Sequence, residues 1–449
     1  MSDLRIRRGQ NVTLDTVDGE LKVGHNATLQ AAGGKTINVS KGVYLEGKAY
    51  VNGSLECDSI QSEVFMSKTG ELNAGGQSAR LELIGRYVGK LEVSGNLTVH
   101  KQLNVSHSVE VKGAIIAGDI DVGGKIEAGA VKCGRMRVGG RADVQNRLEA
   151  QSVDVGGKVV ASGPVKIGDL NVGGEAEVGG GSITGSIHVG GKFIAKAPLE
   201  FGELQVYGRG CLPAGCKGHR ISTFGKLEVG GDLTCDIIEA GGVIEISGSC
   251  TSQKAEVGGK FEVSGSLHVS DLFKGCGNSQ ISGVLECRQL AFSGKLAAGK
   301  IVVQEEADIS GKTEVKEGLK ARLVTVRSGS RCEGTLIGEQ VIIGKSADVS
   351  CNQVGVDWVI EHHAILLNQA IVSRGLWAGG GMARVDDVYG KEVVLGAMCR
   401  AGRIFADKVK LEQGSAAEQV TYTDEFKMDF GAAVSEEPKK TDTIPKPPF

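Results

Sequence analysis

Apolar and polar residues alternate in short runs along most of the chain. In the stretch KLEVSGNLTVHKQLNVSHSVEV, pairs of the form apolar-x-apolar recur every five or six residues, at Leu91/Val93, Leu97/Val99, Leu103/Val105 and Val109/Val111. Alternation with a period of two is typical of a β-strand with one buried face. Gly, Ser, Asn, His and Lys lie between the pairs, and these residues are typical of turns and surfaces. The pattern predicts short strands separated by tight corners.

A longer period groups these strands. Apolar residues that precede a corner return about every 17 residues, at Val88, Val105, Val122, Val138, Val155, Val172, Val189 and Val206, then after a 23-residue step at Val229, Ile246, Val263 and Ile281, and further on at Phe292, Ile309, Val326, Ile343 and Ile360. Three short strands per unit of about 17 residues predict an all-β fold, a parallel β-helix with triangular turns. Glycine at about every sixth residue would break a helix.

The corners explain the high glycine content of 69 residues. Stacked turns place equivalent residues about 4.8 Å apart, so inward valines would form a column along the axis. The Gly-Gly that follows Val122, Val138 and Val155 would mark a corner where the chain turns tightly. No single turn would be stable alone, and the array is expected to be stabilised by contacts between neighbouring turns.

Interruptions of the repeat suggest a division of the chain. Residues 1–9 are expected to form a short N-terminal segment, and residues 10–351 a regular β-solenoid. The stretch YGRGCLPAGCKGHRIST, residues 207–223, contains the six residues that lengthen one step, and it is expected to project as a loop. Residues 352–432 keep strands but lose regularity, which predicts a second block or a C-terminal cap with both tryptophans, Trp358 and Trp377. The Pro- and Lys-rich tail, residues 433–449, is expected to be disordered.

Charge and hydropathy limit the partners and the location. The chain has 51 basic and 54 acidic residues and a net charge of −3, so nucleic acid is not an expected partner. No run of 18 apolar residues could span a membrane as a helix, and the N-terminus has no apolar stretch long enough for a signal peptide. A cytoplasmic location is therefore expected.

Candidate chemistry is sparse. Cys57, Cys133, Cys235 and Cys287 stand where valine stands in other repeats, which predicts small core residues, and an odd total of 11 cysteines argues against a disulfide framework. Cys211, Cys216 and His219 have part of a zinc-site spacing but supply at most three ligands. A surface loop is the favoured interpretation, and metal binding there is left open. The adjacent pair His362-His363 would face opposite ways on a strand. No catalytic residue, metal or cofactor is predicted.

The Gly-rich 17-residue repeat, with VGG, VSG and ISG corners, resembles the bactofilins, a family of polymer-forming cytoskeletal proteins that includes archaeal members. The likeness is carried by FGKLEVGGDLTCDIIEAGG, VGGKFEVSGSLHV, ISGKTEVKEGLKARLVTV and RIFADKVKLEQGSAAEQVTYTDEF. The resemblance implies a right-handed β-helix that assembles end to end, without nucleotide, into non-polar filaments or sheets that act as scaffolds. The usual member has one short solenoid between two tails, whereas this chain is several times longer.

Self-association would use the terminal turns, where a solenoid leaves backbone groups and apolar side chains without a neighbour. Leu4, Ile6, Val12 and Leu14 follow the apolar-x-apolar pattern near the N-terminus, so this end is expected to be open. Phe426, Met428 and Phe430 are expected to fold over the last turn. The expected partner is a second copy of the chain, with other proteins possible through the Pro-rich tail, and membrane association is left open.

Two other classes of β-helical protein fit the sequence less well. A left-handed hexapeptide-repeat acyltransferase would need a strict six-residue repeat and hence 18 residues per turn, whereas the observed spacing is 17. A secreted carbohydrate-active or adhesive β-helix would have longer, more aromatic turns and an export signal, whereas aromatic residues make up 4% of this chain. The sequence therefore favours a non-enzymatic scaffold.

Overall fold

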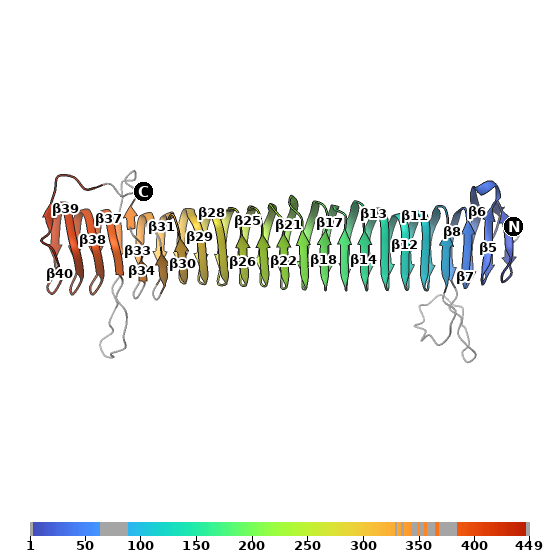
Figure 1. Cartoon of the computed structure of the whole chain (residues 1–449), viewed down its shortest axis with the longest axis horizontal. Coiled ribbons are helices and arrows are strands. Elements are labelled where there is room, and N and C mark those ends of the chain that lie inside the picture. The colour runs from blue at the N-terminus through green and yellow to red at the C-terminus, as the bar shows by residue number, and fades with distance from the viewer. Residues whose placement is uncertain are drawn as a thin grey trace, which may run out of the picture. The chain divides into compact units, whose positions relative to one another are not determined.

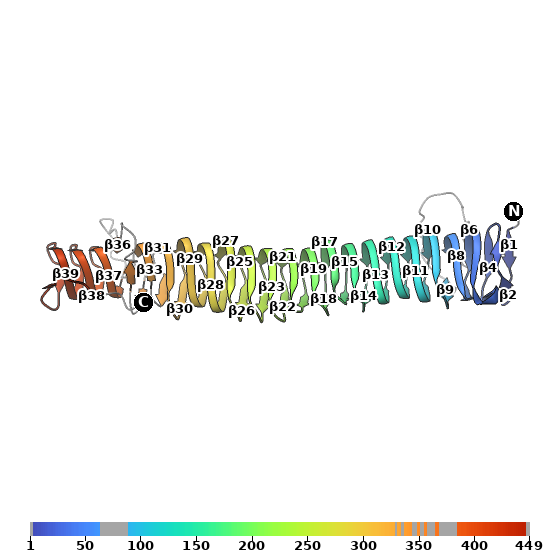
Figure 2. The same cartoon turned by 90° about the horizontal axis from the view of Figure 1, so that it is seen from above.

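The computed structural model describes residues 3–62, 89–327, 330–333, 336–343, 348–350, 354–356, 364–367 and 384–445. About 75% of the described residues are in β-strands. The single helical element among the described residues is a 3-10 turn, η1 (Ala32–Gly34). The chain divides into two compact units, Met1–Lys217 and Gly218–Phe449. Figures 1 and 2 show the stacked strands of each unit from two directions.

The strands of the N-terminal unit are β1 (Leu4–Ile6), β2 (Asn11–Leu14), β3 (Thr16–Val17), β4 (Leu21–Gly24), β5 (Ala27–Ala31), β6 (Thr36–Glu46), β7 (Lys48–Asn52), β8 (Ser54–Ser62), β9 (Lys90–Val93), β10 (Leu97–Val105), β11 (Ser108–Val122), β12 (Lys125–Val138), β13 (Arg141–Val155), β14 (Lys158–Ala161), β15 (Val165–Val172), β16 (Glu175–Val178), β17 (Gly181–Val189), β18 (Lys192–Ala195), β19 (Leu199–Val206) and β20 (Arg209–Leu212). The border between the units falls within β21 (Cys216–Thr223).

The described strands of the C-terminal unit are β22 (Lys226–Val229), β23 (Leu233–Ala240), β24 (Val243–Ile246), β25 (Cys250–Val257), β26 (Lys260–Val263), β27 (Leu267–Gly275), β28 (Asn278–Phe292), β29 (Lys295–Ile309), β30 (Lys312–Val315), β31 (Leu319–Val326), β32 (Arg331–Glu333), β33 (Leu336–Ile343), β34 (Asp348–Ser350), β35 (Val354–Val356), β36 (Ala364–Leu367), β37 (Arg384–Leu395), β38 (Arg400–Leu411), β39 (Ala416–Met428), β40 (Ala433–Val434) and β41 (Lys439–Lys440).

Parallel pairing between equivalent residues of successive turns defines the fold. The predicted valine column is present in the N-terminal unit, where the paired residues are Val105, Val122, Val138, Val155, Val172, Val189 and Val206. The described residues make about 21 turns, with equivalent residues about 17 apart. The sequence prediction of an all-β parallel solenoid with this period is confirmed. Val88 lies outside the described residues.

Each turn contains three paired segments, named here the first, second and third segments. In one turn they are Lys158–Ala161, residues 165–167 and residues 169–172, and each pairs with its counterpart in the next turn. Within β15 every second side chain in each segment is buried, so Val172 points inward and Asn171 is exposed. The predicted strand phase is therefore correct in this region.

The corner after the third segment explains the Gly-Gly pairs. A Cβ atom on Gly139 would lie 2.2 Å from the carbonyl oxygen of Gly123, the equivalent residue of the preceding turn. Real Cβ atoms do not approach backbone oxygen so closely, so a side chain there would force the turns apart. Glycine is thus selected at this corner by the close approach of two backbones.

Residues 207–223 do not form the predicted projecting loop. They contain β20, which pairs with β18, and β21, which pairs with β23. Thr223 lies 17 residues after Val206, is 1% exposed, and is followed in its column by Ala240, Val257, Gly275 and Phe292. The 23-residue step has a different cause. Val206 belongs to the third-segment column, whereas Val229, which lies six residues after Thr223, belongs to the first-segment column. No residues are inserted here.

The C-terminal region is more regular than its sequence indicates. From β37 to β39 the spacing of equivalent residues is mostly 16, as in Val388, Ile404 and Val420. Leu367 pairs with Ile343, so it occupies the position that the spacing assigned to Ile360. Ile360, Trp358 and Trp377 lie outside the described residues.

Both chain ends differ from the prediction. β1 belongs to the solenoid, because Leu4 pairs with Leu21 and Ile6 with Val23. The tail is ordered at least to Lys440, because β40 and β41 pair with β39. Amides of Ser435 and Glu436 also donate to the carbonyls of Ala417 and Glu418. Backbone hydrogen bonds need no apolar side chain, which is why a polar tail can still add strands.

Candidate functional site

The first turn leaves one edge of each strand unpaired among the described residues. β1 pairs with β4, β2 with β5 and β3 with β6, in each case on one side. Ile6 is 2% exposed, while Leu4, Val12 and Leu14 are half-buried. These four residues therefore lie together on the first described turn.

Basic side chains lie within β1 and directly after it. The Arg5 guanidinium lies 2.9 Å from Glu46 Oε1 and forms an ion pair. Arg7 and Arg8 are exposed, and neither has an ion pair with any described residue. The backbone of this corner stacks on Gly24, where an added Cβ would lie 2.7 Å from the Arg8 nitrogen. The two free guanidinium groups are thus held at a defined corner of the first turn.

The last turn is only partly covered. β40 pairs with Ala416 and Ala417, and β41 pairs with Thr421 and Tyr422. No described strand pairs with the outer edge of residues 425–428, the third segment of β39. Among the strands that the structure describes, this third segment is therefore paired on one side only.

Contrary to the prediction, the apolar side chains of this segment do not fold over the turn. Met428 is 52% exposed and Phe430 is 92% exposed. Phe426 is half-buried and stacks on Tyr422 with ring centroids 5.6 Å apart. The residues equivalent to Met428 in the two preceding turns, Leu395 and Leu411, are fully buried. Met428 is exposed because no described strand pairs with the outer edge of this segment.

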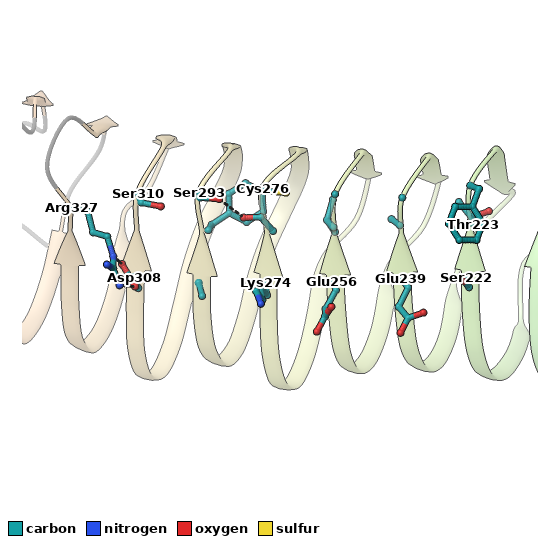
Figure 3. A pocket seen from close by; sticks show the side chains of 18 residues that line it. Ser222, Thr223, Glu239, Glu256, Lys274, Cys276, Ser293, Asp308, Ser310 and Arg327 are labelled. Carbon is teal, nitrogen blue, oxygen red and sulfur yellow. Dashed lines mark hydrogen bonds and ion pairs between the residues drawn. The ribbon is translucent and has the colours of Figure 1, made fainter.

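A groove of about 780 Å³ runs across successive turns of the C-terminal unit, along the corner after the third segment (Figure 3). The exposed ring of Phe224 borders one end and Arg327 the other. Between them Gly241 and Gly258 carry no side chain at the corner. Small residues in the underlying column, Thr223, Ala240 and Gly275, were the sequence signal that could have located this groove.

The carboxylates that line the groove are already paired. Glu239 lies 2.5 Å from an Arg220 nitrogen, and Glu256 lies 2.7 Å from Lys254 Nζ. The hydrogen bond from Lys254 lowers the pKa of Glu256. Asp308 and Arg327 approach to 2.5 Å. Each of these three carboxylates therefore has a cationic partner.

Most of the predicted core cysteines are buried thiols. Cys57, Cys235 and Cys287 are 1% exposed, while Cys133 is half-buried and so only partly fits the prediction. Burial raises the pKa of each of these four thiols to about 12, and that of Cys250 likewise. A thiol that stays protonated at neutral pH is a poor nucleophile and metal ligand. These residues act as core side chains.

The partial zinc-site spacing does not assemble into a site. In the N-terminal unit, Cys216 is buried, and its sulfur accepts a hydrogen bond from the Leu199 amide at 3.4 Å. In the C-terminal unit, His219 is exposed, and its Nδ1 lies 2.8 Å from Asp236 Oδ2. Throughout the described part of the chain, no group of three or more His, Cys, Asp or Glu side chains could hold a metal ion. His362 and His363 lie outside that part.

Comparison with known proteins assigns no family to the chain. Within the described residues there is no helix long and apolar enough to cross a membrane. No family model, no curated protein and no solved structure matches the sequence.

Proposed function

We propose that this protein is a non-enzymatic structural scaffold that assembles end to end, without nucleotide or other cofactor, into cytoplasmic filaments or oligomers. The observation that carries the proposal is the unpaired third segment of the last turn, with Met428 and Phe430 exposed beside it. An edge of this kind, with apolar side chains, is a template for another strand. The Pro-rich tail would bring other proteins to the assembly.

The proposal includes finer features of the fold. Three segments per turn with glycine corners support a triangular cross-section. The resemblance of the repeat to the bactofilins supports a right-handed coil, polymer formation, and a role in cell shape and in recruiting other proteins. Ion-paired carboxylates in the groove and buried thiols support a protein without catalytic residues.

The proposal is tested by measuring the mass of the purified chain over a range of protein and salt concentrations, with electron microscopy of the same samples. We expect species larger than the 46.7 kDa monomer. The double variant Ile6→Asp, Leu14→Asp should give a folded monomer, because it places charge on the first turn. A wild-type protein that remains monomeric at every concentration and salt tested would contradict the proposal.

A further inference from the structure

Two corner glycines of the groove, Gly241 and Gly258, are not required by the packing of the backbone. Apart from neighbours in the chain, a Cβ atom on Gly241 would lie no closer than 3.4 Å to any atom, and one on Gly258 no closer than 3.8 Å. These are ordinary contact distances, unlike the 2.2 Å at Gly139 in the N-terminal unit. Equivalent residues of neighbouring turns, Phe224 and Cys276, carry side chains at this corner. The two glycines thus leave a space, named here the notch, that the fold itself does not demand.

Backbone hydrogen bonds account for the difference between the corners. The amides of Gly241 and Gly242 both donate to the Thr223 carbonyl, at 3.0 and 2.9 Å, and the next turn repeats this arrangement. In the N-terminal unit, the amides of Gly139 and Gly140 donate to two different residues of the preceding turn. Only the second glycine of the pair stacks closely at the groove, since a Cβ on Gly242 would lie 2.1 Å from a backbone oxygen. The first glycine is left open to a ligand.

The notch lies between an exposed ring and an exposed cation. Phe224, one turn before the notch, is 64% exposed. Lys274 pairs in register with Glu256 on the turn after the notch, and it has no ion pair with a described residue. The carboxylates of the same rim, Glu239, Glu256 and Asp308, each have a cationic partner (Figure 3). Lys274 is therefore a positive charge of the groove that remains available to a ligand.

A buried hydroxyl also lines the groove beside the notch. Thr223 is 1% exposed, and its Oγ1 has no hydrogen-bond partner among the described residues. It is drawn with the other lining side chains, directly before Phe224 (Figure 3). A buried polar atom without a partner is unfavourable, so a ligand group that reaches it would supply a hydrogen bond that the free protein lacks. This observation is independent of the glycines and also indicates a ligand.

Spacing along the groove selects the class of ligand. Successive turns are about 4.8 Å apart, so Lys274 lies about 7 Å along the axis from the middle of the notch. In an extended peptide, side chains two residues apart point to the same face and are also about 7 Å apart. A large apolar side chain in the notch would thus bring a carboxylate two residues away to the Lys274 ammonium group.

Other classes of ligand match the groove less well. A sugar chain needs many polar partners, whereas the underlying column offers residues such as Ala240 and Val257. An acyl chain has its anionic group at one end, whereas Lys274 lies midway between the turns of Phe224 and Arg327 that border the groove. A peptide can place a charge at any point along its length.

We propose that this groove binds an extended segment of a partner protein, with a large apolar side chain at one position and Asp or Glu two positions away. The apolar side chain would pack against the Phe224 ring, and the carboxylate would pair with Lys274. As a site of recruitment the groove rests on the proposed function, because it names the kind of partner that the scaffold would hold. The binding itself needs one chain and no assembly.

Fluorescence anisotropy with labelled peptides tests the proposal on the full chain. The probes are Ser-Gly-Phe-Thr-Glu-Gly-Ser and Ser-Gly-Glu-Thr-Phe-Gly-Ser, with blocked ends, because the direction of the segment is part of the test. At least one should bind saturably. Replacing its Phe by Ala, or moving its Glu next to Phe, should weaken binding at least tenfold, since adjacent side chains face opposite ways. If neither probe binds, the proposal is wrong.

Two variants locate the binding in the groove. Gly241→Leu fills the notch and should weaken binding at least tenfold, while thermal unfolding stays close to wild type because the added Cβ meets only ordinary contacts. Lys274→Glu should lose the Glu probe and bind the same peptide with Lys in place of Glu. The matched control, Lys300→Glu, lies at an exposed site outside the groove and should bind like wild type. Unchanged binding by Gly241→Leu would overturn the proposal.

An exposed thiol provides a footprint of the bound peptide. Cys276 is exposed and lines the groove, whereas Cys133 is a half-buried thiol of the N-terminal unit. Saturating peptide should slow the alkylation of Cys276 by iodoacetamide at least fivefold, measured by mass spectrometry of the digested chain, and leave Cys133 unchanged. Binding without protection of Cys276 would place the peptide elsewhere and contradict the proposal.

The outcomes separate this inference from the proposed function. A chain that assembles but binds neither peptide supports the scaffold and refutes the peptide groove. A chain that binds peptide in the groove but stays monomeric at every concentration supports the groove and contradicts the scaffold. Vesicles of phosphatidylcholine with phosphatidylglycerol are the competing ligand. If they bind in place of the peptides, and Gly241→Leu abolishes this, the groove is a lipid site and the proposal is wrong.

Discussion

The third-segment column has a different composition in the two units. In the N-terminal unit it is valine in seven successive described turns, from Val105 to Val206, and all of these side chains are buried. In the C-terminal unit the same position holds Thr223, Ala240, Val257, Gly275 and Phe292. Both columns keep parallel pairing. The fold therefore depends on the spacing of inward positions, while side-chain size decides where the surface is hollowed.

The valine column of the N-terminal unit should be the most sensitive to a buried charge. Val172→Asp places a carboxylate between two apolar rungs, and we expect a loss of about 4 kcal/mol in the free energy of unfolding. Denaturant unfolding with limited proteolysis measures it. The neighbouring exposed change Asn171→Asp should be nearly neutral. Equal protease resistance of the two variants would show that the inward phase of this column is wrong.

In the C-terminal unit, the stability of the third-segment column should depend on one large side chain. The Phe292 ring lies where a Cβ on Gly275 would be, with its Cε2 2.3 Å from that position. Phe292→Ala should cost about 3 kcal/mol, because it empties a buried site that spans two turns. Phe224→Ala, at an exposed ring 64% accessible, should cost about 0.5 kcal/mol or less. Thermal unfolding of both variants gives the comparison, and similar costs would argue against the packing described.

The size match of Gly275 and Phe292 can be tested by making the third-segment column of the C-terminal unit resemble that of the N-terminal unit. Gly275→Val alone should destabilise by about 2 kcal/mol through overpacking. Combined with Phe292→Val, the cost should be smaller than the sum of the two single changes, because the valines restore the pattern of the N-terminal unit. A double-mutant cycle in denaturant gives the coupling energy. Additive costs would mean that the two residues do not share one space.

Alkaline pH should weaken both units through their buried thiols. The pKa values of Cys57 and Cys133, and of Cys235, Cys250 and Cys287, are raised to about 12 by burial. An unfolded thiol ionises near pH 8.5, so above that pH the unfolded state binds fewer protons and stability falls until the pH passes 12. Each thiol contributes up to about 1.4 kcal/mol per pH unit. Urea unfolding at pH 8 and pH 9.5 measures this, and Cys287→Val should reduce the slope.

The smallest effect on stability is expected at a buried hydroxyl in the third-segment column of the C-terminal unit. Thr223 Oγ1 is buried and has no hydrogen-bond partner among the described residues. Thr223→Val makes this position match the N-terminal unit and should stabilise by on the order of 1 kcal/mol, since an unsatisfied polar atom is removed. The exposed change Thr234→Val is the control and should give no gain. A loss of stability in Thr223→Val would indicate that the hydroxyl has a partner.

The sequence predicted the fold more fully than the candidate site. Inward residues such as Val172 could be assigned because apolar alternation follows directly from the pleat of a strand. Thr223, Ala240 and Gly275 could not, because none of them stands out from a corner residue by its hydropathy. For that reason residues 207–223, which form a complete turn, were interpreted as an insert, and the groove beside this column was not predicted. The sequence indicated that Leu4 and Ile6 are strand residues near the N-terminus, but it did not predict the exposure of Met428 and Phe430.

The sequence by itself determined the period of the turn, the strand phase and the positions of the glycine corners, because each of these follows from side-chain size and polarity along one turn. Only the tertiary structure decided that residues 207–223 form a regular turn and that the polar tail adds β40 and β41. The physical reason is that stacking of turns is fixed by backbone hydrogen bonds between residues 16 or more apart, and these bonds are nearly independent of side-chain identity.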